Sequence, residues 1–86
     1  MTPLRDADAQ LGGAGQLRAL SLAVREARGV LRRVDRLAAV CEGLDEPAAA
    51  ARARALRDAC EGTLAELIRL HAAAQRRAVA QVRGEA

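Results

Sequence analysis

An apolar stripe with helical spacing runs through residues 17–42, and it constrains the fold more than any other feature of the chain. Its members alternate at spacings of three and four residues, the seam of a heptad pattern: Leu17, Leu20, Val24, Ala27, Leu31, Val34, Ala38 and Cys41. Ala23, Val30 and Leu37 widen this seam on one side, while arginines occupy the opposite face. A helix of this kind must pack against a second apolar surface.

A second apolar stripe begins at Pro47 and continues to about Arg83. Its members recur at close to the helical period: Ala53, Leu56, Cys60, Leu64, Leu67, His71, Ala74, Ala78 and Val82. Between the stripes, Gly43 is placed to end the first helix, and Asp45 is placed to cap the second. The pattern therefore predicts an all-α fold, an antiparallel two-helix hairpin with its turn at residues 43–46.

The facing sides of the two stripes should form the seam of this hairpin. The expected register places Val34 near Leu56 and leaves Ala74 to Val82 beyond the start of the first helix. The predicted seam residues are Leu20, Val24, Leu31, Val34, Leu56, Leu64 and Leu67.

Two stretches raise questions about continuity. The glycines among residues 12–15 disfavour helix, so residues 1–15 are expected to be a flexible tail and residues 16–86 the hairpin domain. Gly62 precedes a possible capping box at Thr63 and Glu66, which leaves a kink open as an alternative. A continuous helix is favoured because the apolar period continues across Gly62 without a slip.

The core of such a hairpin is thin. The chain has no Phe, Tyr or Trp, the residues that usually bury the most area, and alanine supplies much of the interior. A lone hairpin would gain little stability from burial, so association into a larger helical assembly is expected.

Cys41, Cys60 and His71 are the candidates for site chemistry. In a straight hairpin the two thiols lie roughly 18 Å apart along the helix axes, too far for a disulfide. His71 lies 11 residues beyond Cys60 on the same helix, too far to share a metal with either thiol. We therefore predict buried thiols and a packing histidine, with no metal, no cofactor and no enzymatic activity.

Every basic residue is arginine, and the formal net charge is +3. Glu26 and Asp35 interrupt the arginine run of the first helix, and no aromatic side chain is present to stack on bases, so the pattern does not favour nucleic acid as a partner. No apolar run suits a secretory signal or a membrane span. The expected location is the cytoplasm.

Four apolar residues should remain outside the seam, and we predict them to bind a partner: Val30, Leu37, Ile68 and Val79. Exposed apolar edges along a groove suit an amphipathic helix. The occupant would be a helix of another protein, or a second copy that completes an antiparallel four-helix dimer.

Several motifs resemble one known family. They are the opening residues 1–4, the segment 24–31 (Val-Arg-Glu-Ala-Arg-Gly-Val-Leu), the restart at Pro47, the segment 53–56 (Ala-Arg-Ala-Leu) and a Leu-rich stretch that ends at Leu70. This layout resembles the small co-chaperones of the type III secretion needle subunit. The resemblance implies a secretion chaperone or adaptor that pairs with a helical-repeat co-chaperone and keeps the needle subunit from polymerising. The alternatives are a homodimeric DNA-binding regulator and a purely structural oligomerisation domain.

Overall fold

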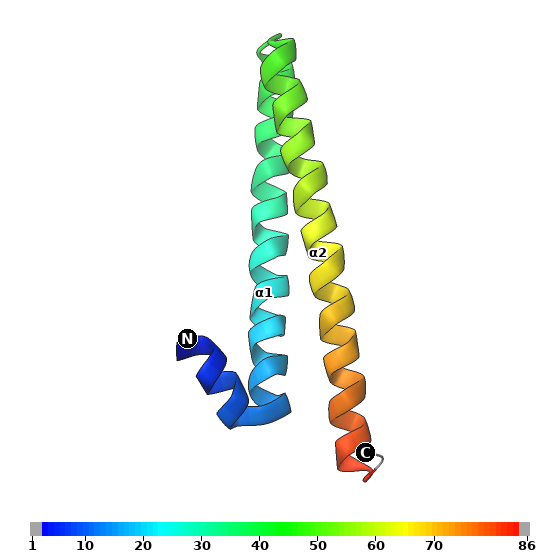
Figure 1. The fold of residues 1–86 in the computed structure, drawn as a ribbon. Helices are drawn as coiled ribbons and strands as arrows, with labels where there is room; N and C mark the ends of the chain where they lie inside the picture. The colour runs from blue at the N-terminus through cyan, green and yellow to red at the C-terminus, as the bar shows by residue number, and fades with distance from the viewer. Residues whose placement is uncertain (1–2, 85–86) are drawn as a thin grey trace.

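The chain forms an antiparallel hairpin of two long α-helices in a computed structural model, which describes the backbone of residues 3–84 and the side chains of residues 14–84 (Figure 1). Helix α1 spans Pro3–Gly43 and helix α2 spans Pro47–Val82. No strand occurs within residues 3–84. The predicted all-α hairpin is confirmed.

The turn lies where the sequence places it, but its residues have different roles from those expected. Gly43 is the last residue of α1, and the Leu44 amide donates to the carbonyls of Val40 and Cys41 at 3.0 and 3.2 Å. Asp45 reverses the chain with a φ of 58°, a left-handed conformation that Asp tolerates better than most residues do. Asp45 was predicted to cap α2, and this prediction is wrong. Glu46 occupies the capping position, without a side-chain hydrogen bond to the helix.

Helix α1 begins earlier than the sequence led us to expect. Its bounds are Pro3–Gly43, whereas a flexible tail was predicted for residues 1–15. A glycine costs about 1 kcal/mol relative to alanine inside a helix, which weakens the helix without forbidding it. Residues 1–2 and the side chains up to residue 13 lie outside the described part of the chain.

Helix α2 is continuous across Gly62, so the structure adopts no helix break there. The Thr63 hydroxyl donates to the carbonyl of Ala59, four residues earlier, at 3.1 Å. This bond belongs to a helix interior and not to the predicted capping box. A Cβ at Gly62 would have no neighbour within 4 Å, so the glycine is not required by close packing.

The seam follows a strict heptad on both helices. On α1 it passes through the predicted stripe, with Val24, Val34 and Ala38 buried. On α2 it passes through Ala50, Ala53, Arg57, Cys60, Leu64, Leu67, His71, Ala74 and Ala78, each buried or half-buried.

Leu56 was predicted to lie in this seam, but the structure leaves it 47% exposed. Alternating steps of three and four from Ala50 and Ala53 lead to position 57. Leu56 is one residue earlier and points about 100° away around the helix. Arg57 therefore takes the seam position that sequence reasoning assigned to a leucine.

In the view of Figure 1 the ribbons of the two helices overlap near the turn and diverge toward the open end. The buried residues near the turn are Ala38, Ala50 and Ala53, whose small side chains allow close approach. Larger seam residues, including Leu31 and Leu64, fill the wider part. The result is an elongated hairpin with extents of 58 × 27 × 15 Å.

The open end is better covered than predicted. Ala74 was expected to lie beyond the start of α1, yet it is only 4% exposed. Arg77 Nη2 donates to Gln16 Oε1 across the hairpin at 3.3 Å. The predicted register, in which Val34 lies beside Leu56, is therefore wrong. In the structure the two helices are shifted by about three residues relative to it.

Candidate protein-binding face

The two edges of the seam differ in character, and the difference defines the candidate site. On one edge, Val30 of α1 and Thr63 of α2 lie together, lining an apolar depression of about 250 Å³ with Ala27, Ala59 and Cys60. Residues seven apart lie on the same face of a heptad helix. This depression therefore fixes which flanking residues of α1 and α2 share this edge.

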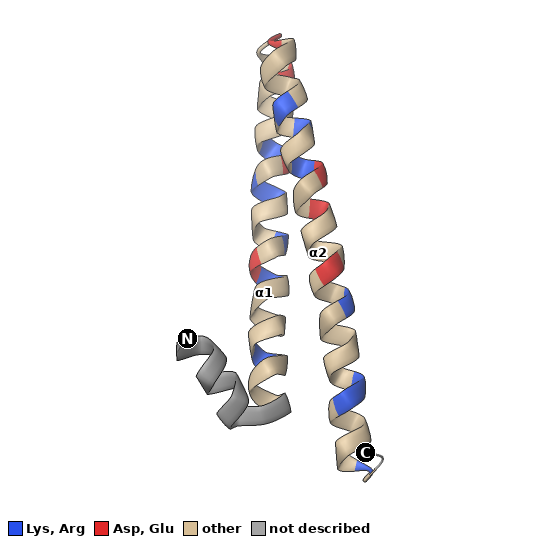
Figure 2. Ribbon diagram, viewed as in Figure 1, with Lys and Arg blue, Asp and Glu red and all other residues tan. Residues whose placement is uncertain are grey.

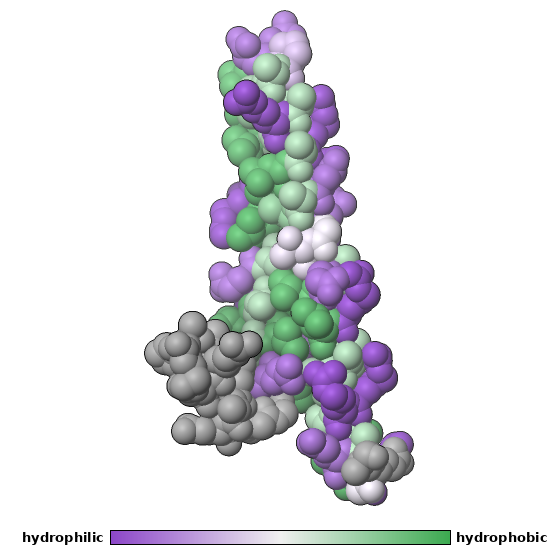
Figure 3. Space-filling view, in the orientation of Figure 1, coloured by the Kyte–Doolittle hydropathy of each residue, from purple (hydrophilic) through white to green (hydrophobic). Residues whose placement is uncertain are grey.

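Steps of seven residues from the depression give a continuous surface, the apolar face, made of Ala23, Val30, Leu37, Leu56, Thr63 and Leu70. Its four large hydrophobic side chains are between 39% and 47% exposed. Figure 3 shows this side of the hairpin, with hydrophobic side chains gathered along the line between the helices. A small soluble domain seldom leaves so many large apolar side chains together in water.

On the opposite edge, ion pairs join α1 to α2. Arg54 Nη1 lies 3.1 Å from Glu42 Oε1, and Arg57 Nε lies 3.9 Å from Asp35 Oδ1. Heptad steps from these pairs define the charged edge, which consists of Ser21, Arg28, Asp35 and Glu42 on α1 and Arg54, Glu61, Ile68 and Gln75 on α2.

Arg57 brings a charge into the seam itself. Its Nε is buried and has no hydrogen-bond partner, although Asp35 and Glu61 carboxylate oxygens lie 3.9 and 3.8 Å away. Its Nη2 lies 3.8 Å from Asp58 Oδ1. Three carboxylates thus surround one guanidinium. Its buried Nε nevertheless has no hydrogen bond, which lowers the stability of the hairpin.

His71 lies in the seam, half-buried, as predicted for a packing residue. It lines a depression of about 420 Å³ with Ser21, Val24, Arg25, Arg28 and Arg32. No carboxylate lies within 4 Å of these three arginines among residues 14–84, and none of the described lining residues is acidic. This depression can attract an anion, but it offers no acid and base pair for catalysis.

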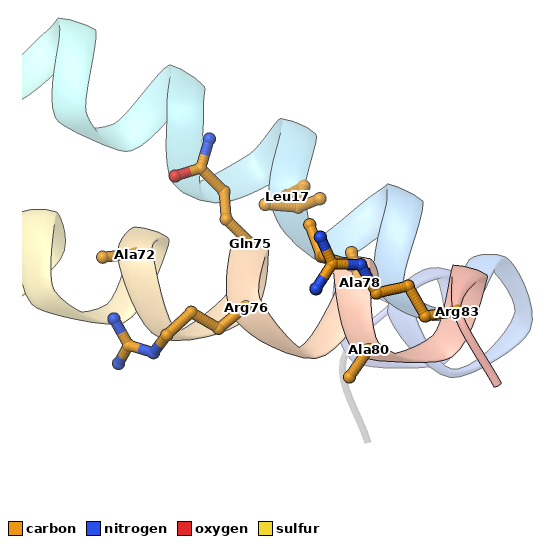
Figure 4. A pocket seen from close by; sticks show the side chains of 8 residues that line it. Leu17, Ala72, Gln75, Arg76, Ala78, Ala80 and Arg83 are labelled. Atoms are coloured by element: carbon orange, nitrogen blue, oxygen red, sulfur yellow. The ribbon is translucent and has the colours of Figure 1, made fainter. Parts of the chain in front are cut away.

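A larger and open depression of about 750 Å³ lies at the open end (Figure 4). Leu17 of α1 faces the last turns of α2 there. Gln75, Arg76 and Arg83 are the polar lining residues, and the others are alanines, Leu17 and Val79.

The structure divides the four predicted binding residues among three places. Val30 and Leu37 share the apolar face. Ile68 belongs to the charged edge, and Val79 lies at the open end. All four are exposed.

Sequence reasoning missed two members of the face. Leu56 was assigned to the seam and Leu70 was not named as a binding residue, but both are exposed on the same face as Val30 and Leu37. The signal that could have found them is the unbroken heptad of α2, which places both at the same position of successive repeats.

The thiols and the remaining candidate ligands form no cluster in the described residues. Cys41 and Cys60 are both free and half-buried. Within residues 14–84, no group of three metal-binding side chains comes together. No described helix is long and apolar enough to cross a membrane.

Comparisons with known proteins give no relative: no family model, no curated protein and no solved structure matches the chain. The function must therefore be argued from the two edges of the hairpin.

Proposed function

We propose that this protein is a protein–protein interaction module that binds amphipathic helices on its apolar face. The observation that carries the proposal is the cluster of four large hydrophobic side chains on that face, Val30, Leu37, Leu56 and Leu70. Burying a side chain of this size contributes about 1.5 to 3 kcal/mol. A helix presenting apolar residues at heptad spacing would match the groove between α1 and α2.

The finer form of the proposal is a small cytoplasmic chaperone or adaptor that covers an amphipathic helix of a second protein. Its support is the geometry of the face together with the sequence resemblance to the type III secretion co-chaperones. The sequestered helix would be one that otherwise assembles with its own kind. The module itself needs no catalytic group.

A labelled helical peptide tests the coarse proposal. The probe is a synthetic amphipathic peptide of about three heptads, with Leu and Ala on its inner positions and Glu outside, followed by fluorescence anisotropy. Wild-type protein should bind it saturably, in competition with any second copy of the chain on the same face, and Leu37→Asp with Leu56→Asp should weaken binding at least about tenfold.

Leu22→Asp is the matched control, because Leu22 is 56% exposed but lies on the outer side of α1. It should bind the peptide like the wild type. Equal binding by the wild type and the double variant would refute the apolar face as the site, provided that circular dichroism shows both to be folded.

Nucleic-acid binding is a second candidate, favoured only by the depression lined with Arg25, Arg28 and Arg32. Binding through these side chains would depend steeply on salt. A mobility shift with duplex DNA should disappear at about 0.15 M salt if the arginines act only by non-specific attraction. A shift that persists there and is lost in Arg28→Glu with Arg32→Glu would support the regulator.

A further inference from the structure

The hairpin leaves much of its surface exposed. The chain exposes 6462 Å², whereas a compact monomer of this mass exposes roughly 4,900 Å². The apolar face contributes four exposed large hydrophobic side chains to this surface.

Small side chains occupy the middle of the apolar face. Thr63 and Ala59 border the depression beside Val30, with leucines seven residues to either side on α2. The Thr63 hydroxyl already donates to the Ala59 carbonyl, so covering it would leave no unpaired donor. A second copy could therefore approach closely at this level.

The apolar face is self-complementary about that level. A two-fold axis beside Val30 and Thr63 would place Leu37 of one copy over Ala23 of the other, because both lie seven residues from Val30. It would also place Leu56 over Leu70, which lie seven residues to either side of Thr63. A large side chain then meets a small one on α1, and leucine meets leucine on α2, as an isologous interface requires.

Charge favours the same arrangement. Arg33 and Glu26 lie on α1 on the outer flank of the apolar face, and neither has an ion-pair partner among the described residues. The midpoint between them falls beside Val30, so the axis that matches the leucines also brings Arg33 of each copy beside Glu26 of the other. Such a flanking pair helps to set orientation in helical assemblies.

The two halves of the hairpin also carry unequal charge, as Figure 2 shows. The half toward the open end, residues 14–32 and 62–84, holds eight arginines and two acidic residues, a net charge of +6. The half toward the turn, residues 33–61, holds five arginines and six acidic residues, a net charge of −1. Antiparallel stacking keeps the two strongly basic halves apart, whereas parallel stacking would bring them together.

We propose that a second copy of this chain covers the apolar face, giving an antiparallel four-helix dimer whose two-fold axis passes beside Val30 and Thr63. This inference rests on the proposed function, because it takes the same face as the binding site and names its occupant. The dimer completes a four-helix core that one hairpin lacks.

Sedimentation equilibrium of the full chain tests the dimer. The wild type should sediment as a dimer at about 10 µM, and Leu37→Asp with Leu56→Asp should raise the dissociation constant at least about a hundredfold. Leu22→Asp should change it by less than about threefold. A dimer that persists in the double variant would overturn the proposal.

Charge exchange tests the orientation. Arg33→Glu and Glu26→Arg should each weaken the homodimer, and a mixture of the two single variants should form heterodimers in preference to either homodimer. In the wild type, Arg33 of one copy meets Glu26 of the other only when the copies are antiparallel about Val30, so only that arrangement makes each single variant repel its own copy and weakens the homodimer. Random pairing of the two variants would overturn the antiparallel arrangement.

Failure of the dimer and failure of the proposed function give different results. A wild-type chain that is monomeric but still binds the helical peptide through Leu37 and Leu56 refutes the second copy and keeps the interaction module. A monomeric chain that binds no peptide refutes both.

Discussion

The apolar face and the charged edge flank the same seam at the same heptad distance, yet only one of them is satisfied within the chain. On the charged edge, Glu42 meets Arg54 and Asp35 meets Arg57, so each helix supplies a partner to the other. On the apolar face, Leu37 and Leu56 remain exposed on both helices. Intrachain pairing therefore decides which side of a hairpin is left for another molecule.

Making the charged edge apolar should have the largest effect. Ser21→Leu with Arg28→Leu, beside the exposed Ile68, would create a second face able to bury area in a neighbour. We expect assemblies larger than a dimer in sedimentation velocity. Arg36→Leu with Ala55→Leu, both on outer positions, is the control and should leave the mass of the assembly unchanged. An unchanged mass in Ser21→Leu with Arg28→Leu would show that the two edges differ less than we infer.

Removing the charge from the seam should stabilise the hairpin. In Arg57→Leu, the buried Nε, which has no hydrogen bond, is replaced by apolar atoms at a seam position, and the free energy of unfolding should rise by about 1 to 2 kcal/mol. Urea denaturation followed by circular dichroism measures the change. Arg69→Leu, on the outer side of α2, should change it by less than about 0.5 kcal/mol, and a loss of stability in Arg57→Leu would mean that its ion pairs outweigh the buried nitrogen.

A change that touches neither edge supplies a reference for these values. A Cβ at Gly62 meets nothing within 4 Å, so Gly62→Ala should raise the free energy of unfolding by about 1 kcal/mol through helix propensity alone. Gly84→Ala should bring no gain, because Gly84 has a φ of 75° and lies beyond α2. Destabilisation by Gly62→Ala in the same urea titration would contradict a straight α2.

The smallest effect should come from the ion pair nearest the turn. The side chains of Arg54 and Glu42 are 46% and 56% exposed, and exposed pairs contribute about 0.2 to 1 kcal/mol. Glu42→Gln should lower the free energy of unfolding at the low end of that range, and less still at about 1 M salt. Glu46→Gln is the control; a large loss that salt does not reduce would mean that the pair does more than surface electrostatics allows.

The hairpin and its turn were predictable because they depend on periodicity and on turn residues, which are local properties. The heptad of α1 and the restart at Pro47 gave the helix pairing directly. The role of Asp45 was less accessible, because capping and left-handed conformations favour the same residue types. The start of α1 was missed because glycine lowers helix propensity without setting a boundary.

The candidate site was only half predictable, and the reason lies in one residue. Hydrophobicity favoured Leu56 over Arg57 for the seam, although the spacing from Ala53 favours Arg57. The ion pair with Asp35 depends on the neighbouring helix, which sequence periodicity does not describe. If Leu56 is assigned to the interior, the apolar face has only three large side chains, and the sequence no longer indicates that the face is continuous.

The labelling rates of the two thiols can report how much of the apolar face is covered by another molecule. Cys60 lines the depression in the middle of the apolar face, and Cys41 lines a separate depression at the turn beside Glu42 and Arg54. A maleimide reagent should label Cys60 more slowly as protein concentration rises, while labelling of Cys41 keeps a constant rate. The ratio of the two rates, measured by mass spectrometry in one tube without any introduced label, would follow occupancy of the face under the conditions of a cell extract as readily as in buffer.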